Sequence, residues 1–577
     1  MSAMQSLDSA RQKPLRMWPG IAIVLLQWLA RYGIPFVVPE ATAFRAMGAV
    51  FGGLAVVVWW GCFSRAPRID RWSGVALLVV TPLITWLFLH ESIASGGMGM
   101  LFVIYATPPL CLAFVAWAVA CRRLPDRLRR LALVATVLLA CGVWTLYRTS
   151  GITGDRIASF EWRWAQTSEQ RLVDRPGSGS SAASPAPVAD RPGSTWPGFR
   201  GPNRDGVVRD LRIETDWKTS PPVELWRRPI GPGWSSFAAR NGLLYTQEQR
   251  GDEERVACYD AATGEPVWTH RDTTRFWESG TGAGPRATPT LHGDQLYALG
   301  ATGFLNALDA TDGTVKWSRH VATDTATEIP LWGFSSSPLV VHDIVIVAAA
   351  GRLVGYGTTD GELRWLGPDR GGSWGSYASP HLMTIDGIEQ VLLLSGAGLT
   401  GLGPATGALL WEYPWPGFGM VQPAMTADGD LLIGADDIGT RRMTVSRRTK
   451  GWSIEERWTT IGLKPYFNDF VIDDNHAYGF DGGILACIDL ANGERKWKGG
   501  RYGHGQLVLV AEQDLLLVIS ERGELALVGA TPDRFVEFAR IPVLEGKTWN
   551  HPVLTGDVLL LRNDREMVAL RLPLARN

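Results

Sequence analysis

The chain has 577 residues, of which 20% are charged, and its formal net charge is −1. This balance lacks the basic face or stripe that nucleic-acid binding needs, and we expect no nucleic-acid partner. The six cysteines form no C-x-x-C motif, which argues against a disulfide-stapled scaffold, a zinc ribbon or c-type haem attachment.

Apolar runs dominate the first 150 residues, and the charged residues lie mostly beyond them. A membrane-spanning helix needs about 20 predominantly apolar residues, and five stretches qualify. We therefore expect an N-terminal all-α, five-helix transmembrane bundle within residues 18–148 that anchors the chain in the lipid bilayer. The five predicted spans are roughly 18–38, 46–63, 72–90, 98–121 and 131–147.

The charges of the connections predict an orientation. In chain order, the segment before the first span and the four connections carry 3, 1, 3, 0 and 5 Lys or Arg residues. By the positive-inside rule, residues 1–17 are cytoplasmic and everything after 148 lies outside the cytoplasm. In a bacterial cell, the membrane is then the cytoplasmic (inner) membrane and the outside is the periplasm. Arg31 is charged and lies within a span, where we expect it to snorkel or to mark a break in the helix.

Residues 149–194 form a predicted periplasmic stem and linker. Its second part, Asp174–Ser194, consists mostly of Pro, Gly, Ser and Ala. Such a composition cannot bury a core, so we expect a semi-flexible tether. The character of the sequence changes again at Thr195, where a separate domain, 195–577, begins.

One motif recurs in this last domain. It is built around Gly and Trp, which are both frequent in the chain, with 65 Gly and 26 Trp residues. A Gly precedes a Trp by four residues, and the flanking apolar residues alternate as in strands. The Gly supplies the φ > 0 position that closes a hairpin, and we expect the Trp of the outgoing strand in the core. Five gapless copies are Cys258–Trp268, Ala307–Trp317, Gly355–Trp365, Gly401–Trp411 and Cys487–Trp497, and degenerate copies end at Trp458 and Glu537.

A second ladder precedes the hairpins and marks the first strand of each unit. Its eight copies are 37 to 52 residues apart, the length of a four-stranded propeller blade with its loops. The eight starts are Trp234–Phe237, Arg286–Pro289, Ser335–Pro338, Tyr377–Pro380, Met420–Pro423, Phe467–Phe470, His504–Leu507 and Trp549–Pro552.

The two ends of this domain complement each other. The last unit ends with a third strand, Met567–Leu572, whereas Val223–Ile230 is a lone strand that carries Trp226. Pairing them removes two open sheet edges. We therefore predict an all-β, eight-bladed propeller of four-stranded blades, with its ring closed by pairing of the N- and C-terminal strands.

The D-x-x-T-G-x-x-x-W hairpin resembles the repeat of the quinoprotein, or PQQ-like, eight-bladed propellers. The resemblance covers about 196–572, and Trp196–Gly206 is similar to the opening segment of bacterial PQQ-binding-like proteins without an assigned reaction. That superfamily includes PQQ-dependent alcohol and glucose dehydrogenases and a cofactor-free lipoprotein of outer-membrane protein assembly. The resemblance implies the fold and leaves the function open.

Two functions stay open at this point. One is a membrane-anchored periplasmic propeller that binds a small molecule, peptide or protein, with no catalysis and no cofactor. The other follows from a similarity to membrane-bound glucose dehydrogenase: a PQQ- and Ca²⁺-dependent enzyme that oxidises a sugar or alcohol and reduces membrane quinone. We favour the first, because the chain lacks the long insertions between blades and the adjacent cysteines that the resemblance leads us to expect of such enzymes.

The first residues of the innermost strands line the mouth of a propeller's channel, and a site there combines aromatic walls with a few polar groups. Small Ser and Thr residues at these starts are expected to satisfy backbone groups. Asn468 and Asp469 are candidates for a metal, and Asp469 is also the candidate for catalysis. The predicted ligand-binding residues are Trp234, Arg286, Trp332, Tyr377, Tyr466, Asn468, His504, Gln506, Trp549, Asn550 and His551.

Overall fold

The computed structural model describes residues 15–34, 43–174, 195–369, 376–436 and 438–575. The chain divides into two compact units, the first formed by residues 1–165 with 279–281 and the second by 166–278 with 282–577. The division falls inside the predicted stem. Most of the predicted tether, residues 175–194, lies outside the described residues, as do residues 1–14 of the predicted cytoplasmic N-terminus.

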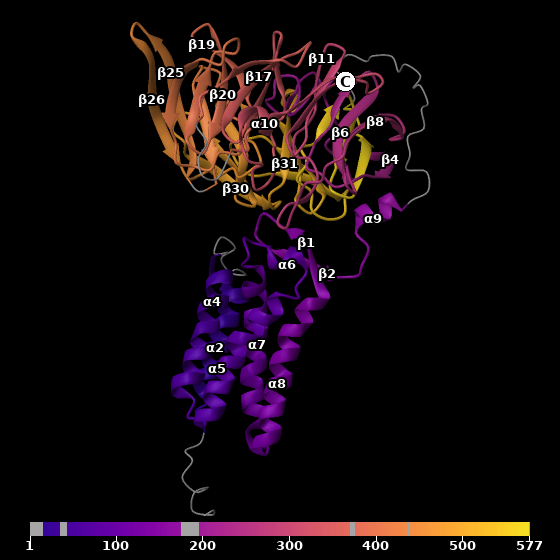
Figure 1. Cartoon of the computed structure of the whole chain (residues 1–577). Helices are drawn as coiled ribbons and strands as arrows, with labels where there is room; N and C mark the ends of the chain where they lie inside the picture. The colour runs from indigo at the N-terminus through magenta and orange to yellow at the C-terminus, as the bar shows by residue number, and fades with distance from the viewer. Residues whose placement is uncertain (1–14, 35–42, 175–194, 370–375, 437, 576–577) are drawn as a thin grey trace, which may run out of the picture. The chain divides into compact units, whose positions relative to one another are not determined.

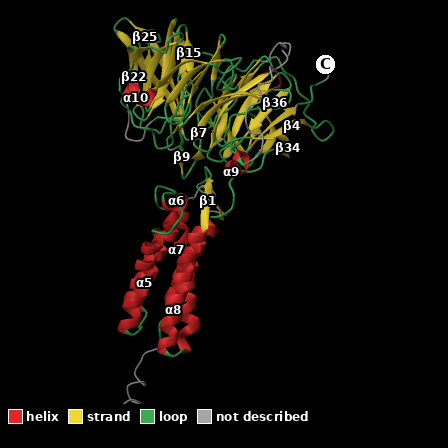
Figure 2. Ribbon diagram, turned by 45° about the vertical axis from the view of Figure 1, so that its right-hand side comes forward, coloured by secondary structure: helices red, strands yellow, loops and turns green. Residues whose placement is uncertain are grey.

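The first unit is mainly helical (Figure 2). Five-residue π-helical segments, Leu29–Gly33 and Trp59–Phe63, continue α2 and α4, and a short antiparallel hairpin follows α8. The elements are α2 (Trp18–Trp28), α4 (Ala43–Val58), α5 (Arg68–Trp86), α6 (Glu91–Ala94), α7 (Leu101–Ala120), α8 (Asp126–Gly142), β1 (Tyr147–Ile152) and β2 (Ala158–Trp162).

Three helical stretches of the described residues are long and apolar enough to cross a membrane: Ala46–Phe63, Leu101–Arg123 and Asp126–Leu146. They correspond to the second, fourth and fifth predicted spans. The first predicted span runs into residues 35–38, which lie outside the described residues, and α5 opens with a polar turn that contains Asp70. The unit is therefore a group of apolar helices with three candidate spans, a coarser result than the predicted five-span bundle.

Arg31 lies at a helix irregularity, as one of the two alternatives predicted, and it does not snorkel. Arg31 has 5% of its surface exposed, and its Nη1 donates to the carbonyl of Ile104 at 2.8 Å. Ile104 stands four residues before Pro108 in α7, and proline has no N–H to donate to that carbonyl. Arg31 therefore supplies the donor that the proline removes.

The second unit contains eight sheets of four antiparallel strands, one of which has an additional parallel strand, and these are the eight predicted blades. Figure 1 shows the strands of this unit. Seven blades follow the chain order, and the eighth combines strands from both ends of the domain. Blades 1 to 3 contain β5–β8 (Ala238–Arg240, Leu243–Arg250, Glu253–Asp260, Pro266–Asp272), β11–β14 (Thr290–His292, Gln295–Leu299, Phe304–Asp309, Val315–His320) and β15–β18 (Leu339–Val341, Ile344–Ala349, Arg352–Gly357, Leu363–Leu366).

The remaining blades have the same strand order. Blades 4 to 6 contain β19–β22 (His381–Ile385, Ile388–Ser395, Gly398–Leu402, Leu409–Pro414), β23–β26 (Ala424–Met425, Leu431–Ala435, Gly439–Arg448, Gly451–Thr460) and β27–β30 (Val471–Asp473, His476–Asp481, Ile484–Asp489, Arg495–Arg501). Blade 7 contains β31–β34 (Gln506–Val510, Leu515–Ile519, Glu524–Gly529, Glu537–Pro542), and blade 8 contains β35–β37 (Val553–Thr555, Val558–Arg562, Glu566–Arg571) with β4 (Val223–Pro229).

Short elements complete the second unit. β3 pairs in parallel with β31 as a fifth strand of blade 7. These elements are α9 (Ser168–Val173), β3 (Val207–Val208), β9 (Trp277–Glu278), β10 (Gly282–Ala283) and α10 (Val321–Thr325).

At five of the eight seams between blades, the repeated Trp joins one blade to the next. The indole of Trp226 lies on Gly264 of the hairpin in blade 1, where a Cβ on that glycine would be 2.7 Å from the ring. Its Nε1 donates to the carbonyl of Ala261 in the same turn at 2.9 Å. The glycine needs its φ of +69° for the turn and its missing side chain for the indole. Trp268, Trp317, Trp365 and Trp458 lie in the same way on Gly313, Gly361, Gly407 and Gly493.

Blade 5 departs from the pattern and explains why its copy of the motif is degenerate. In place of the tight turn, β25 and β26 form a hairpin of two ten-residue strands (Figure 1). β24 pairs only with residues 439–443, so the outer half of the hairpin extends past the neighbouring strand. Trp411 of blade 4 therefore finds no turn glycine there, and its Nε1 donates to Gln390 Oε1 at 2.6 Å instead.

Blade 8 combines the two chain ends of the domain, as predicted. β4 pairs antiparallel with β37, and Trp226 stands opposite Ala569. One hydrophobic cluster contains residues of both blade 8 and blade 1, among them Trp226, Leu560 and Leu244. Arg562 is buried beside them, and its Nη1 donates to the carbonyl of Gln247 in blade 1 at 2.9 Å.

We expect Trp226→Ala to lower the free energy of unfolding by about 3–5 kcal/mol, the usual cost of removing a buried Trp side chain. The indole is lost from the blade 8 to blade 1 contact together with its hydrogen bond. Urea unfolding of the purified protein, followed by circular dichroism of the β-sheet, measures this change. Val223→Ala in the same strand is the control, because Val223 is 58% exposed and should change stability by less than about 0.5 kcal/mol. Equal effects of the two variants would contradict the role of Trp226.

Candidate functional site

Polar residues just before the first strands link neighbouring blades. The backbone N–H of each donates to the side-chain hydroxyl at the same position of the next blade. These pairs are Ser236 with Thr288, Thr288 with Ser337, and Ser337 with Ser379, each at 3.0 Å. The small Ser and Thr residues therefore satisfy backbone groups, as expected.

Asp469 occupies the same position in blade 6, and its surroundings bear on the predicted metal site. Its Oδ1 accepts the backbone N–H of Gln422 at 2.7 Å and lies 3.6 Å from Arg200 Nη1. Burial raises the pKa of Asp469, and the guanidinium of Arg200 opposes that rise. Asn468 Oδ1 accepts the backbone N–H of Tyr466 at 3.1 Å. A guanidinium beside the carboxylate disfavours a divalent cation there, and in the described parts of the chain no three His, Cys, Asp or Glu residues are grouped to hold a metal.

A short segment, Trp196–Val208, lies across the centre of the propeller, and we call it the crossing segment. It reaches blades on several sides, so it must run between them. Its contacts are Trp196 with Ala239 of blade 1, Pro197 with Leu291 of blade 2, Arg204 with the carbonyls of Ser337 and Pro338 of blade 3, Arg200 with the carbonyl of Phe470 of blade 6, and β3 with β31 of blade 7.

Three aromatic side chains from the starts of blades 1, 6 and 8 come together: Trp234, Phe467 and Trp549. We call them the aromatic mouth. The ring centroids of Trp234 and Trp549 are 4.8 Å apart, and those of Phe467 and Trp549 are 4.9 Å apart. All three are half-buried. Lys547 places its Nζ 4.0 Å from the Trp549 ring centroid, and Glu521 accepts a hydrogen bond from Trp549 Nε1 at 2.8 Å.

Two further predicted residues border the aromatic mouth. The ring of His504 lies 5.8 Å from that of Phe467 and 5.5 Å from that of Tyr466. The Nδ1 of His504 is 4.0 Å from Glu521 Oε2. Trp234, Trp549, Tyr466 and His504 therefore form one group, although their binding role stays a prediction.

Other predicted residues gather in a second group. The ring centroids of Trp332 and Tyr377 are 5.0 Å apart, and Phe418 lies within 6 Å of both. Arg286 donates to the carbonyl of Trp332 at 2.9 Å and to that of Gly282 at 3.0 Å. Burial lowers the pKa of Arg286 to about 10. Its hydrogen bonds organise the loops around the group.

Three predicted residues are buried within the blades. Asn550 Nδ2 donates to the carbonyl of Ser235 at 2.7 Å, and His551 Nδ1 lies 2.8 Å from the carbonyl of Pro552. Burial lowers the pKa of His551 to about 3, so this imidazole is neutral at physiological pH. Gln506 begins β31 and is also buried. These side chains therefore face backbone and core.

Sequence reasoning missed several residues of this region. Lys547, Glu521 and Phe418 lie in loops outside the ladder of strand starts, so no repeat position singles them out. Phe467 stands on the ladder but was not among the predicted ligand-binding residues. For the crossing segment, the sequence shows a similarity of Trp196–Gly206 to the opening segment of related propellers, but nothing in it indicates the contacts with several blades.

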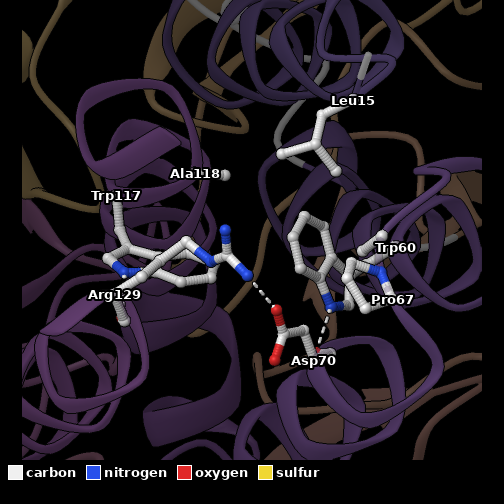
Figure 3. Close-up of a pocket in the computed structure, with 8 residues that line it drawn as sticks. Leu15, Trp60, Pro67, Asp70, Trp117, Ala118 and Arg129 are labelled. Atoms are coloured by element: carbon white, nitrogen blue, oxygen red, sulfur yellow. Dashed lines mark hydrogen bonds and ion pairs between the residues drawn. The ribbon is translucent and has the colours of Figure 1, made fainter. Parts of the chain in front are cut away.

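A small cavity of about 10 Å³ lies in the helical unit (Figure 3). Asp70 there forms ion pairs with Arg129 and Arg130, at 2.6 Å to the latter. Trp60 Nε1 donates to the carbonyl of Asp70, and Trp117 Nε1 to that of Arg129. The cavity has room for about one water molecule, so this cluster joins α5 to α8 and is not a ligand pocket.

The fold defines the class of protein: an eight-bladed propeller whose blades dock through a Trp on a hairpin turn. A sequence profile of the family described as outer membrane protein assembly factor BamB, a PQQ-like repeat family, matches residues 214–368 and 252–499. Over these residues, the propeller of this chain is similar to that PQQ-like repeat family.

Individual relatives agree with this family. The outer membrane protein assembly factor BamB of Yersinia pestis is 23% identical over 322 residues, covering 53% of this chain and 70% of the relative. That of Burkholderia pseudomallei is 24% identical over 336 residues, covering 50% and 86%.

Solved structures that resemble this chain include both a BamB and a quinoprotein. BamB from Moraxella catarrhalis has a TM-score of 0.44 at 14% identity and covers 61% of this chain and 99% of that one. Quinohemoprotein alcohol dehydrogenase from Comamonas testosteroni has a TM-score of 0.47 at 12% identity and covers 66% and 81%.

Glu254 is a buried carboxyl group at the start of β7. Its Oε1 accepts the backbone N–H of Ala301 at 3.2 Å, and its Oε2 accepts the hydroxyl of Thr302 at 3.1 Å. Burial raises its pKa from 4.5 to about 7. The neutral form is therefore favoured in the folded protein, and the stability linked to this group is greatest below pH 4.5 and declines as the pH rises through 7.

We expect Glu254→Gln to reduce the loss of stability between pH 5 and pH 8 by up to about 3 kcal/mol, at 1.36 kcal/mol per pKa unit. Gln keeps the shape of the neutral acid and does not ionise. Melting temperatures of the wild type and the variant across this pH range measure the effect. The control is Glu362→Gln, an exposed position. Parallel pH profiles of wild type and Glu254→Gln would show that Glu254 does not ionise in this range.

Proposed function

We propose that this chain is a membrane-attached propeller that binds a protein or peptide through the aromatic mouth. The observation that carries the proposal is the group of half-buried Trp234, Phe467 and Trp549 at the blade starts. Aromatic side chains of this kind supply much of the binding energy in protein interfaces. The crossing segment contacts blades 1, 2, 3, 6 and 7, so we expect a partner to meet the rims of the blades and not an open channel.

The proposal includes a closed ring of eight blades. Support comes from the pairing of β4 with β37 and from the hydrophobic cluster that blade 8 shares with blade 1. Buried Arg562 adds donors across the same seam, at 2.9 Å to the carbonyl of Gln247 and 3.0 Å to that of Gly231. A closed ring fixes the positions of residues from distant blades, which a composite site such as the aromatic mouth requires.

We further propose attachment to a bacterial cytoplasmic membrane through five helices, with the N-terminus in the cytoplasm and the propeller in the periplasm. Three candidate spans and the alternation of basic connections support this placement. The family profile and the relatives carry the name of an outer membrane protein assembly factor, which favours a protein partner outside the cytoplasm.

A PQQ- and Ca²⁺-dependent dehydrogenase is the other function that the sequence leaves open. PQQ needs a clamp for its carboxylates, and Ca²⁺ needs six to eight oxygen ligands. Asp469, the predicted metal and catalytic residue, accepts a backbone N–H and faces Arg200. No contact of the described residues favours this second function over binding.

The proposed orientation predicts which residues are accessible from outside the cell. In a Cys62→Ser background, which removes the exposed native thiol, we expect Asp533→Cys to react with a membrane-impermeant maleimide in spheroplasts. Arg127→Cys, in the connection before α8, should react only after the membrane is permeabilised. The reverse pattern would place the propeller in the cytoplasm and refute this localisation.

The proposed binding function predicts position-specific cross-linking. With p-benzoylphenylalanine at Trp234 or Trp549, we expect ultraviolet light to join the protein to one discrete partner of the periplasm or outer membrane. The control position is Glu362, in the turn between β17 and β18 of blade 3, at the end of the blade opposite to the start of its first strand. Adducts that are equally abundant from Glu362, or absent from both aromatic positions, would count against the aromatic mouth as the binding site.

A further inference from the structure

We propose that the aromatic mouth recognises a cationic group, a Lys or Arg side chain or an alkylammonium ion, and that Lys547 occupies this site from within the chain. This inference rests on the proposed function of the aromatic mouth and names the chemistry of its ligand. An arriving cation displaces the Lys547 ammonium and takes its place against the indoles.

The geometry of the rings suits a cation. Trp234 and Trp549 meet at an interplanar angle of 43°, and Phe467 meets Trp549 at 56°, so the three rings form walls and not a flat stack. Lys547 Nζ lies 4.0 Å from the ring centroid of Trp549 and 4.9 Å from that of Trp234. Both distances are inside the range of about 6 Å in which an aromatic face attracts a positive charge. The Lys547 ammonium thus already makes the cation–π contact that we propose for the ligand.

The charges around the mouth favour the same class of ligand. Burial lowers the pKa of Lys547 to about 8, while the carboxylates of Asp564, Glu521 and Glu278 act to raise it and Arg286 acts to lower it. Glu521 also holds the indole of Trp549 by a hydrogen bond at 2.8 Å. Asp564 keeps its ion pair with Arg565 at 3.6 Å when Lys547 swings away, and the carboxylates of Glu521 and Glu278 remain near the mouth, where an incoming positive charge takes the place of the ammonium.

The anchoring of the loop allows Lys547 to leave without unfolding the mouth. The backbone N–H of Thr548 donates to the carbonyl of Glu521 at 2.9 Å, and the Asn550 side chain donates to the carbonyl of Gly233 at 3.1 Å. These bonds hold the residues after Lys547 in place. The ammonium itself is carried by a flexible four-carbon stem on a half-buried residue, so an arriving cation can displace it through a change of side-chain rotamer.

Binding of radiolabelled choline to the purified full-length protein, measured by equilibrium dialysis, tests the proposal. We expect Lys547→Ala to bind choline about tenfold more tightly than wild type, because the internal competitor is gone. Lys547→Arg is the matched control and should bind as weakly as wild type. Trp549→Ala in the Lys547→Ala background should lose the gain. The neutral isostere 3,3-dimethylbutan-1-ol should fail to compete, since it has the shape of choline without the charge.

Equal choline affinity of wild type and Lys547→Ala would overturn the proposal, and so would full competition by 3,3-dimethylbutan-1-ol. If Lys547→Ala melts well below wild type, Lys547→Met replaces it, because Met keeps the apolar stem without the charge. The outcome is separable from that of the proposed function. A cross-linked partner without choline binding refutes the cationic ligand alone, whereas choline binding without a cross-linked partner supports the cation site and refutes the protein-binding function.

Discussion

The propeller depends on one recurring contact, present at five of the eight seams between blades: an indole seated on the glycine of a hairpin turn in the next blade. The glycine serves two needs at once, because the turn requires φ > 0 and the ring leaves no room for a Cβ. The indole N–H then donates to a carbonyl of the same turn, as Trp317 does to Thr358 at 2.8 Å. A single residue thus fixes the distance and the rotation between blades. The size and placement of every other feature follow from this spacing.

The candidate site is a product of that spacing. Trp234, Phe467 and Trp549 are far apart in the sequence, and they meet because the starts of blades 1, 6 and 8 are set around a common centre. The crossing segment ties several blades together through the side chains of Arg200 and Arg204. The surface is thus assembled from distant parts of the chain, each held in place by its own blade.

The fold could be predicted because each blade repeats the same chemistry. The ladder of eight strand starts predicted the number of blades, the Gly and Trp of the hairpin predicted the outer strands, and the lone strand with Trp226 predicted the pairing of β4 with β37. The site was less predictable. Lys547 and Glu521 stand in loops that no repeat position marks, and the packing of two guanidinium groups against the centre leaves no pattern in the sequence. In the helices, hydropathy could not show that Arg31 turns inward to serve a carbonyl that Pro108 leaves without a donor.

The blade that combines both ends of the domain also sets the order in which strands pair during folding. Arg227 in β4 pairs with Glu566 in β37, and 339 residues separate them. During synthesis, β4 is among the first propeller strands to appear and the last to find its neighbour. β4 therefore stays unpaired while the other blades form. If a ribosome stalls near the end of the message, the product has an open seam that quality-control proteases can recognise.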